Sequence, residues 1–168
     1  MNPEIAVRLA TFRDAEIVAY HRASMFHQMG QLSDQLFEPF QKRSTERLRE
    51  LFESGEYLGW LACPAKQTDK VIAGAGVQLR RTLPHPAGPR AFAEGRHGLI
   101  INVFTEPDWR RQGIAKLLLN RIIQWSQEQK LDRLVLHASA DGRALYERLG
   151  FIATNEMRLS ATDIADSR

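Results

Sequence analysis

The sequence predicts a single domain of the α/β (α+β) class, with a mixed, mostly antiparallel central sheet flanked by helices. Two patterns support this fold class. Apolar runs at 57–63 and 71–79 flank a polar turn at 65–70, which is typical of an antiparallel hairpin. Further along, an apolar run at 99–104, an amphipathic helix and a second run at 133–138 follow in that order. This order predicts two parallel strands joined by a right-handed crossover.

The composition is that of a folded domain without a membrane span. The chain has 168 residues, of which 43% are hydrophobic and 26% charged, enough for one sizeable core. No apolar run approaches the roughly 18 residues that a membrane span needs, and acidic residues occupy the N-terminal stretch where a signal peptide would be apolar. We therefore expect no membrane association and a cytoplasmic location.

Cysteine and histidine usage argues against a metal centre. The single cysteine, Cys63, excludes an internal disulfide, and the five histidines are scattered without metal-ligand spacing. We expect no metal, and we interpret Cys63 as a small buried hydrophobic residue.

The charge pattern does not favour nucleic acid as a partner. The formal net charge is only +3, and the basic residues alternate with acids in segments such as 41–50. A local basic cluster of Arg110, Arg111 and Lys116 suits a small polyanion better than a long duplex.

The N-terminal part predicts a strand and two helices. A strand at 5–9 precedes a helix that Thr11 or Asp14 caps and that stops near Gly30. The aromatic and Met residues toward the end of this helix are interpreted as core packing rather than as a substrate pocket.

The second helix is expected at 45–54, with Ser44 as its cap and Gly55 as its stop, after an irregular stretch at 31–43. Its apolar face is formed by Leu48, Leu51 and Phe52.

Two glycine-containing segments follow. Gly74 and Gly76 lack the third glycine and the helix start of a dinucleotide loop, so they are expected to mark a bulge or a close backbone approach. Residues 80–96 hold three prolines and two glycines without periodicity and predict a long loop of a length that is often functional.

The remaining elements complete the crossover and the C-terminal end. Asn102 interrupts the buried strand at 99–104, and apolar residues recur at helical spacing from Ile114 to about Lys130. A helix at 142–149, ended by the left-handed cap Gly150, and a last strand around 156–159 are also expected.

The stretch 101–115 predicts an anion site. A strand, a turn closed by Pro107, a basic loop and a helix start follow one another, and the amides and dipole at a helix N-terminus hold phosphate oxygens. Gly113 permits close approach or a positive φ, and Ala115 keeps the first helical turn uncrowded. The segment after the neighbouring strand, 139–146, is expected at the same sheet edge.

Two motifs in this region resemble the GNAT superfamily of acyl-CoA-dependent N-acetyltransferases. Arg110-x-x-Gly113-x-Ala115 matches the family's acetyl-CoA motif, and the L-Y-E-R-L-G-F segment at 145–151 matches its downstream signature at the usual distance. With their strands and helices the two motifs cover about 99–151. The resemblance implies a GNAT-like fold with a parallel strand pair at the acyl-CoA site.

The resemblance also implies the cosubstrate and its ligands. Acetyl-CoA would be bound without a metal. The residues expected to hold its pyrophosphate are Arg110, Arg111, Gln112, Gly113, Ile114 and Ala115, and the strand backbone expected to bind the pantetheine arm and the acetyl carbonyl is that of Val103, Phe104 and Thr105.

Tyr146 matches the family's general acid, which protonates the departing thiolate; the alternative is a tyrosine packed on an amphipathic helix. Ser139 stands where many relatives carry Asn to hold the coenzyme. It is expected to bind the pantetheine or to cap the helix, and Asp141 is an equally plausible cap.

The general base is not assigned by the sequence. Asn102 is no base at neutral pH, whereas Glu106 lies near the loop. Three histidines are further candidates, although a solvated or core histidine is the more ordinary interpretation: His27, His85 and His97.

These observations predict an enzyme that moves an acetyl group directly from acetyl-CoA to a primary amine of a small molecule or a peptide, whose identity the sequence does not reveal. The alternatives are a non-catalytic acyl-CoA sensor and, less well supported, a basic nucleic-acid-binding module. One domain is expected over 1–168, with the substrate side in 1–96, the coenzyme core in 97–151 and a last strand and tail in 152–168. A homodimer that covers the sheet edge is expected.

Overall fold

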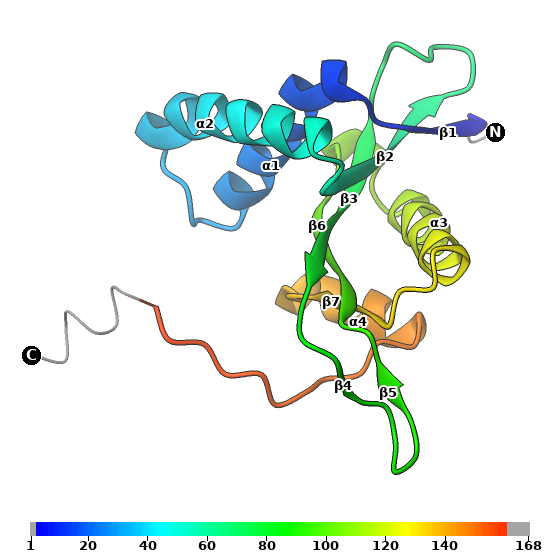
Figure 1. Cartoon of the computed structure of the whole chain (residues 1–168). Helices are drawn as coiled ribbons and strands as arrows, with labels where there is room; N and C mark the ends of the chain where they lie inside the picture. The colour runs from blue at the N-terminus through cyan, green and yellow to red at the C-terminus, as the bar shows by residue number, and fades with distance from the viewer. Residues whose placement is uncertain (1–2, 161–168) are drawn as a thin grey trace, which may run out of the picture. The chain divides into compact units, whose positions relative to one another are not determined.

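The computed structural model describes residues 3–160 (Figure 1). The chain forms two compact units, one up to His137 and one from Ala138 onward, and each is described by itself. The elements of the first unit are β1 (Ile5–Leu9), the 3-10 turn η1 (Phe12–Asp14), α1 (Ala15–Gln28), α2 (Asp34–Glu53), β2 (Tyr57–Pro64), β3 (Ala73–Arg81), β4 (His85–Pro86), β5 (Phe92–Ala93), β6 (Arg96–Thr105), the 3-10 turn η2 (Pro107–Trp109), α3 (Ile114–Glu128) and β7 (Arg133–Leu136).

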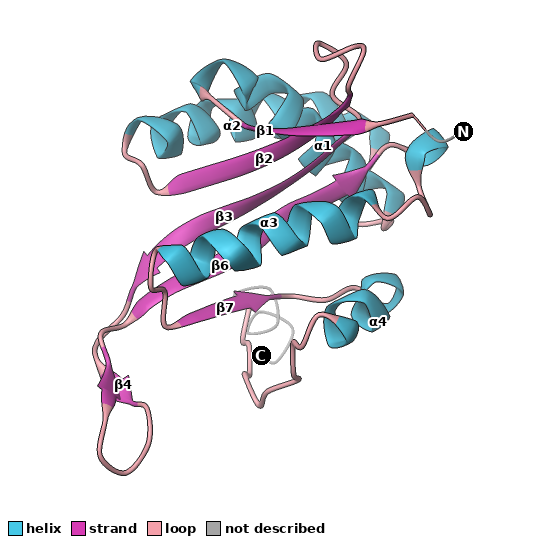
Figure 2. Ribbon diagram, turned by 90° about the vertical axis from the view of Figure 1, so that its right-hand side faces the viewer, coloured by secondary structure: helices cyan, strands magenta, loops and turns pink. Residues whose placement is uncertain are grey.

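The first unit is a three-layer arrangement around a five-stranded sheet of order β1-β2-β3-β6-β7. Helices α1 and α2 cover one face of the sheet and α3 crosses the other (Figure 2). β1 pairs with β2, β2 with β3, and β3 with β6, all antiparallel, whereas β6 and β7 pair parallel. The predicted fold class and the predicted hairpin are therefore confirmed.

The two faces of the sheet hold separate parts of the core. On the side of α1 and α2, Leu61 of β2 packs with residues of both helices. On the other side, Trp60 of β2 meets Trp125 of α3 with ring centroids 5.4 Å apart. Adjacent strand residues point to opposite faces, so β2 is buried on both.

The second helix is longer than the sequence predicts. It begins at Asp34 after Ser33, so the expected irregular stretch at 31–43 and the expected Ser44 cap are wrong. The helix passes through Pro39, a residue that interrupts helical hydrogen bonding. Tertiary packing on α1 outweighs this cost, because two aromatic pairs join the helices with centroids 6.1 and 5.7 Å apart, namely Tyr20 with Phe37 and Phe26 with Phe40.

The predicted loop at 80–96 is only partly a loop. β3 continues to Arg81 and β6 begins at Arg96, and between them the two-residue strands β4 and β5 pair antiparallel. The glycines of β3 mark both a bulge and a close approach, the two alternatives that the sequence predicts. The register to β6 shifts between Gly74 and Gly76, and a side chain on Gly76 would place its Cβ 2.0 Å from the Tyr57 hydroxyl.

The second unit contains α4 (Ala140–Arg148). Ser139 is its N-cap and accepts a 3.2 Å hydrogen bond from the backbone N–H of Gly142, which decides between Ser139 and Asp141 as the cap. The strand expected at 156–159 is wrong, since residues 151–160 form no regular element. Met157 and Leu159 are exposed, so no sheet face buries the apolar side chains of that segment.

Candidate acyl-CoA site

A β-bulge in β6 shapes the first unit's candidate site. Between the pairs Gly74 with Phe104 and Gly76 with Ile101, β3 contributes one residue and β6 contributes two, and Asn102 takes φ 58°. The bulge shifts the alternation of the strand by one residue. Ile101 and Phe104, three positions apart, therefore both pack toward the layer of α1 and α2.

The parallel pairing of β6 is interrupted at the same point. The β6–β7 ladder joins residues 97–100 to 133–136 and ends at Ile100, whereas β6 continues to Thr105 with β3 as its ladder partner. The backbone edge at Val103, Phe104 and Thr105 thus lies beyond the β6–β7 ladder and is not paired with β7. Phe104 offers only its backbone there, because its side chain is buried.

The loop before α3 has the geometry of an anion cradle. Arg111 and Gly113 have φ of 63° and 80°, and Gly113 is the N-cap of α3. No side-chain cap occupies the helix start, and its first turn contains no acid. The first amides of α3, starting with Ile114 and Ala115, and the positive end of the helix dipole are thus available to an anion such as a diphosphate.

The side chain of Arg110 fixes this loop to the strand end. Its Nε donates a 3.0 Å hydrogen bond to the Thr105 carbonyl, and its guanidinium also bonds the Gln28 side chain and lies 5.7 Å from the Phe104 ring centroid. Gln112 donates from Nε2 to the Asp108 carbonyl at 3.3 Å. The loop conformation is therefore held by its own side chains before any ligand binds.

His21 of α1 is a buried residue near the end of β6 that the sequence interpretation missed. It is 1% exposed, neither ring nitrogen has a hydrogen-bond partner among residues 3–160, and its ring centroid lies 5.0 Å from that of Phe104. Burial lowers the pKa of His21 to about 4. The Glu106 carboxylate, 3.4 Å from Nε2, makes no aligned hydrogen bond to the ring. Partial burial raises the pKa of Glu106, an effect that Arg110 opposes.

A second missed group connects α1 to the bulge. Arg22 donates a 2.7 Å hydrogen bond to Asn102 Oδ1, and Asn102 Nδ2 donates at 3.3 Å to the Tyr57 hydroxyl. Burial raises the pKa of Tyr57 to about 12, so the phenol stays neutral. The spacing contained a signal for both residues, since His21 and Arg22 follow Val18 by three and four positions and thus share its buried face.

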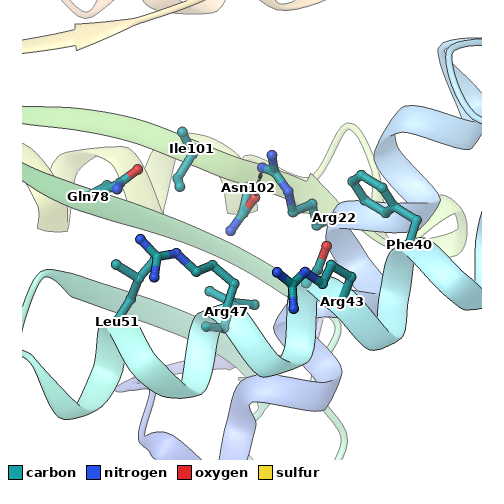
Figure 3. A pocket seen from close by; sticks show the side chains of 10 residues that line it. Arg22, Phe40, Arg43, Arg47, Leu51, Gln78, Ile101 and Asn102 are labelled. Carbon is teal, nitrogen blue, oxygen red and sulfur yellow. Dashed lines mark hydrogen bonds between the residues drawn. The ribbon is translucent and has the colours of Figure 1, made fainter.

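A cavity of about 430 Å³ adjoins the bulge. Figure 3 shows Arg43 and Arg47 extending from α2 toward the strand that carries Asn102. The residues that line the cavity come from α1, α2, β3 and β6: Arg22, Phe40, Arg43, Ser44, Arg47, Leu48, Leu51, Gln78, Ile101 and Asn102.

The other base candidates have identifiable neighbours. His27 pairs with Asp34 at 2.6 Å, and His85 meets His97 edge to face, with ring centroids 5.2 Å apart, at the opposite end of β6 from Thr105. Cys63 is buried, as expected. Within residues 3–160, no cluster of three or more His, Cys, Asp or Glu side chains could hold a metal ion, and none of the helices is long and apolar enough to cross a membrane.

The second unit carries the remaining predicted residues. Tyr146 lies on α4, its ring centroid is 6.0 Å from that of Phe151, and burial raises the pKa of its phenol. Ser139 caps the same helix.

The mixed sheet, the interrupted parallel pair and the uncapped loop before α3 define an α/β protein with a candidate anion site at a strand–loop–helix junction. The chain belongs to the acetyltransferase (GNAT) family, whose model matches residues 26–151. The predicted resemblance is therefore confirmed.

Individual relatives agree with this assignment. The chain is 24% identical over 112 residues to the uncharacterized N-acetyltransferase ycf52 of Pyropia yezoensis, a match that covers 62% of this chain and 64% of the relative, and 23% identical to its counterpart in Porphyra purpurea. The match thus spans less than two thirds of these relatives.

Two crystal structures share the fold over 95% of this chain, both with a TM-score of 0.81. One is a GCN5-related N-acetyltransferase from Ralstonia eutropha JMP134, which is 28% identical in sequence and of whose chain the match covers 99%. The other is a predicted acetyltransferase with acetyl-CoA from Clostridium acetobutylicum, which is 24% identical in sequence and of whose chain the match covers 98%.

The environment of His21 predicts a pH-dependent stability. Because burial lowers its pKa from 6.5 to about 4, the unfolded chain binds the extra proton first as the pH falls. The contribution of His21 to the free energy of unfolding should therefore be constant above pH 6.5 and fall between pH 6.5 and 4, by about 3 kcal/mol.

Urea unfolding at several pH values measures this dependence, with His21→Leu as the test and His27→Leu, which removes an exposed histidine, as the control. His21→Leu should flatten the curve between pH 4 and 6.5, and His27→Leu should not. Equal slopes for wild type and His21→Leu would contradict the assignment.

Proposed function

We propose that the protein is an N-acetyltransferase that moves an acetyl group from acetyl-CoA to a primary amine. The observation that carries this proposal is the α3 loop, in which two positive-φ residues, Arg111 and Gly113, open an uncapped helix start beside exposed arginines. Family membership adds the expectation that the anion bound there is the coenzyme A pyrophosphate.

The proposed binding mode uses two parts of the first unit. The amides of Gln112 to Ala115, with Arg110 and Arg111, would hold the pyrophosphate. The β6 edge at Val103, Phe104 and Thr105 would bind the pantetheine arm and the acetyl carbonyl. A backbone N–H aimed at the thioester oxygen would stabilise negative charge that develops there, which is a large contribution in acyl transfer.

The chemistry needs no covalent enzyme intermediate. The acceptor ammonium first loses one proton to solvent, and its nitrogen lone pair then attacks the thioester carbonyl carbon. A C–N bond forms, the C–S bond breaks, and the thiolate takes a proton from Tyr146, which is restored by the second proton of the amine. Burial raises the pKa of Tyr146, so the phenol stays protonated and ready to donate at neutral pH.

The activity is tested by free-thiol release from acetyl-CoA with a panel of primary amines, with the acetylated product identified by mass spectrometry. Turnover of at least one amine supports the enzyme. Tight coenzyme binding without turnover of any amine would support the alternative, a non-catalytic acyl-CoA sensor.

Tyr146→Phe should lower kcat about 100-fold, because the leaving thiolate loses its proton donor, while the Kd for coenzyme A stays within about twofold of wild type, since a phenyl ring preserves the packing. Tyr20→Phe, which removes the hydroxyl of an exposed tyrosine on α1, is the control and should be neutral. An unchanged kcat for Tyr146→Phe at saturating substrates would remove the general-acid role.

Gly113→Val should abolish coenzyme A binding, measured by calorimetry, because a β-branched side chain opposes φ 80° and projects where the phosphate must approach. Gly55→Val is the matched control. Gly55 also has a positive φ, 71°, and open space around its Cβ, but it follows α2, so its variant should lose similar stability and keep coenzyme binding. Normal binding by a folded Gly113→Val protein would refute the phosphate site.

A further inference from the structure

The cavity beside the bulge, here called the arginine cavity, combines cations with an apolar wall. Arg22, Arg43 and Arg47 line it, and no acidic residue is among its lining side chains. Phe40, Leu48, Leu51 and Ile101 supply apolar surface. A concave site of about 430 Å³ with a few polar groups that converge is typical of a small-molecule site.

Arg22 is the inner cation of the arginine cavity. Its guanidinium is held by Asn102 at 2.7 Å and lies 4.9 Å from the centroid of the Phe26 ring. Burial lowers the pKa of Arg22, which means that the cation has lost part of its hydration. A partly desolvated guanidinium favours an anionic ligand, especially a carboxylate or phosphate that accepts two parallel hydrogen bonds.

Arg43 and Arg47 are the outer cations. They lie four residues apart on α2 and therefore share one side of the helix. Each pairs with a glutamate three residues later, Glu46 at 3.2 Å and Glu50 at 2.5 Å. Both pairs are solvent-exposed, and exposed pairs of this kind contribute little, so an anion that enters the cavity can compete for the guanidinium groups.

The position of the arginine cavity relates it to the proposed reaction. Ile101 and Asn102 line the cavity and directly precede Val103, where the backbone edge proposed to bind the thioester begins. A molecule whose anionic group pairs with the arginines would therefore present its other end beside that edge.

We infer that the acceptor is a small primary amine that also carries a carboxylate or phosphate group, with the anion bound by Arg22, Arg43 and Arg47. This inference rests on the proposed acetyltransferase function. Polyamines and other amines with additional positive charge are disfavoured, because the same arginines repel them.

The first experiment compares matched amines in the thiol-release assay. The pairs are glutamate with glutaminamide, β-alanine with its amide, and phosphoethanolamine with ethanolamine; spermidine and a lysine peptide complete the panel. The anionic member of at least one pair should have a kcat/KM at least tenfold above its neutral partner, and the two chemistries separate carboxylate from phosphate recognition. Preference for neutral amines, spermidine or the lysine peptide would overturn the inference while leaving the acetyltransferase function in place.

The second experiment assigns the effect to the arginine cavity. Arg43→Gln and Arg47→Gln should each raise the KM of the best anionic amine about tenfold, with kcat and the KM of acetyl-CoA unchanged. Arg49→Gln is the matched control, since Arg49 lies on the same helix but contacts Glu16 and the Phe12 ring and does not line the cavity. Equal KM values for all three variants and the wild type would overturn the inference.

Direct binding separates failure of the inference from failure of the proposed function. Glutamate, β-alanine and phosphoethanolamine are titrated into the enzyme without acetyl-CoA, and the rise in Tm is measured. A rise in Tm that Arg47→Gln removes and Arg49→Gln keeps supports the anion site. If no amine is then acetylated, the proposed function fails and the assignment of the bound molecule as the acceptor fails with it, while the anion site itself stands. No rise with any of the three probes, in a protein that acetylates another amine, overturns the inference alone.

Discussion

The bulge at Asn102 is the constraint on which the rest of the site depends. In a regular strand, Ile101 and Phe104 would face opposite sides of the sheet; the extra residue brings both toward α1 and α2. The positive φ of Asn102 costs free energy in a residue other than glycine. The hydrogen bonds from Arg22 to Asn102 and from Asn102 to Tyr57 oppose that cost, so a buried polar chain holds the strand in its bent form.

This arrangement explains why α1 carries a buried histidine, His21, next to a half-buried arginine, Arg22. A charge or an unpaired imidazole inside a protein is costly, and cores normally avoid both. Here Arg22 meets an amide oxygen and two phenyl rings, which compensate its cation. His21 has no hydrogen-bond partner in the described part of the chain and is accommodated by losing its proton. Arg22 contacts Asn102 and His21 contacts Phe104, both in the part of β6 that is no longer paired with β7. These two polar side chains therefore lie where the parallel pairing has ended.

Most of the fold could be predicted from the sequence because it follows from local periodicity: the hairpin of β2 and β3, the crossover through α3 and the anion loop at Gly113 each have a pattern within one segment. The features that were missed depend on contacts between segments. Pro39 disfavours a helix that begins at Asp34, and the packing of Phe37 and Phe40 on α1 stabilises the helix that passes through it. Gly74 and Gly76 predicted a bulge, but the positive φ of Asn102 on the partner strand depends on the pairing of β6 with β3, which involves two separate segments.

The missed half of α2 bears on specificity, because it carries Phe40 and Arg43 into the wall of the arginine cavity. With an irregular segment at 31–43, Arg43 and Arg47 would be unrelated surface charges in a chain whose net charge is only +3. In one continuous helix, Arg43 and Arg47 lie on the same side of α2. Their positive charges line the same cavity as that of Arg22, which comes from α1. The proposed coenzyme site could therefore be predicted from a short motif, whereas the arginine cavity is formed by side chains of four elements that only the tertiary structure brings together.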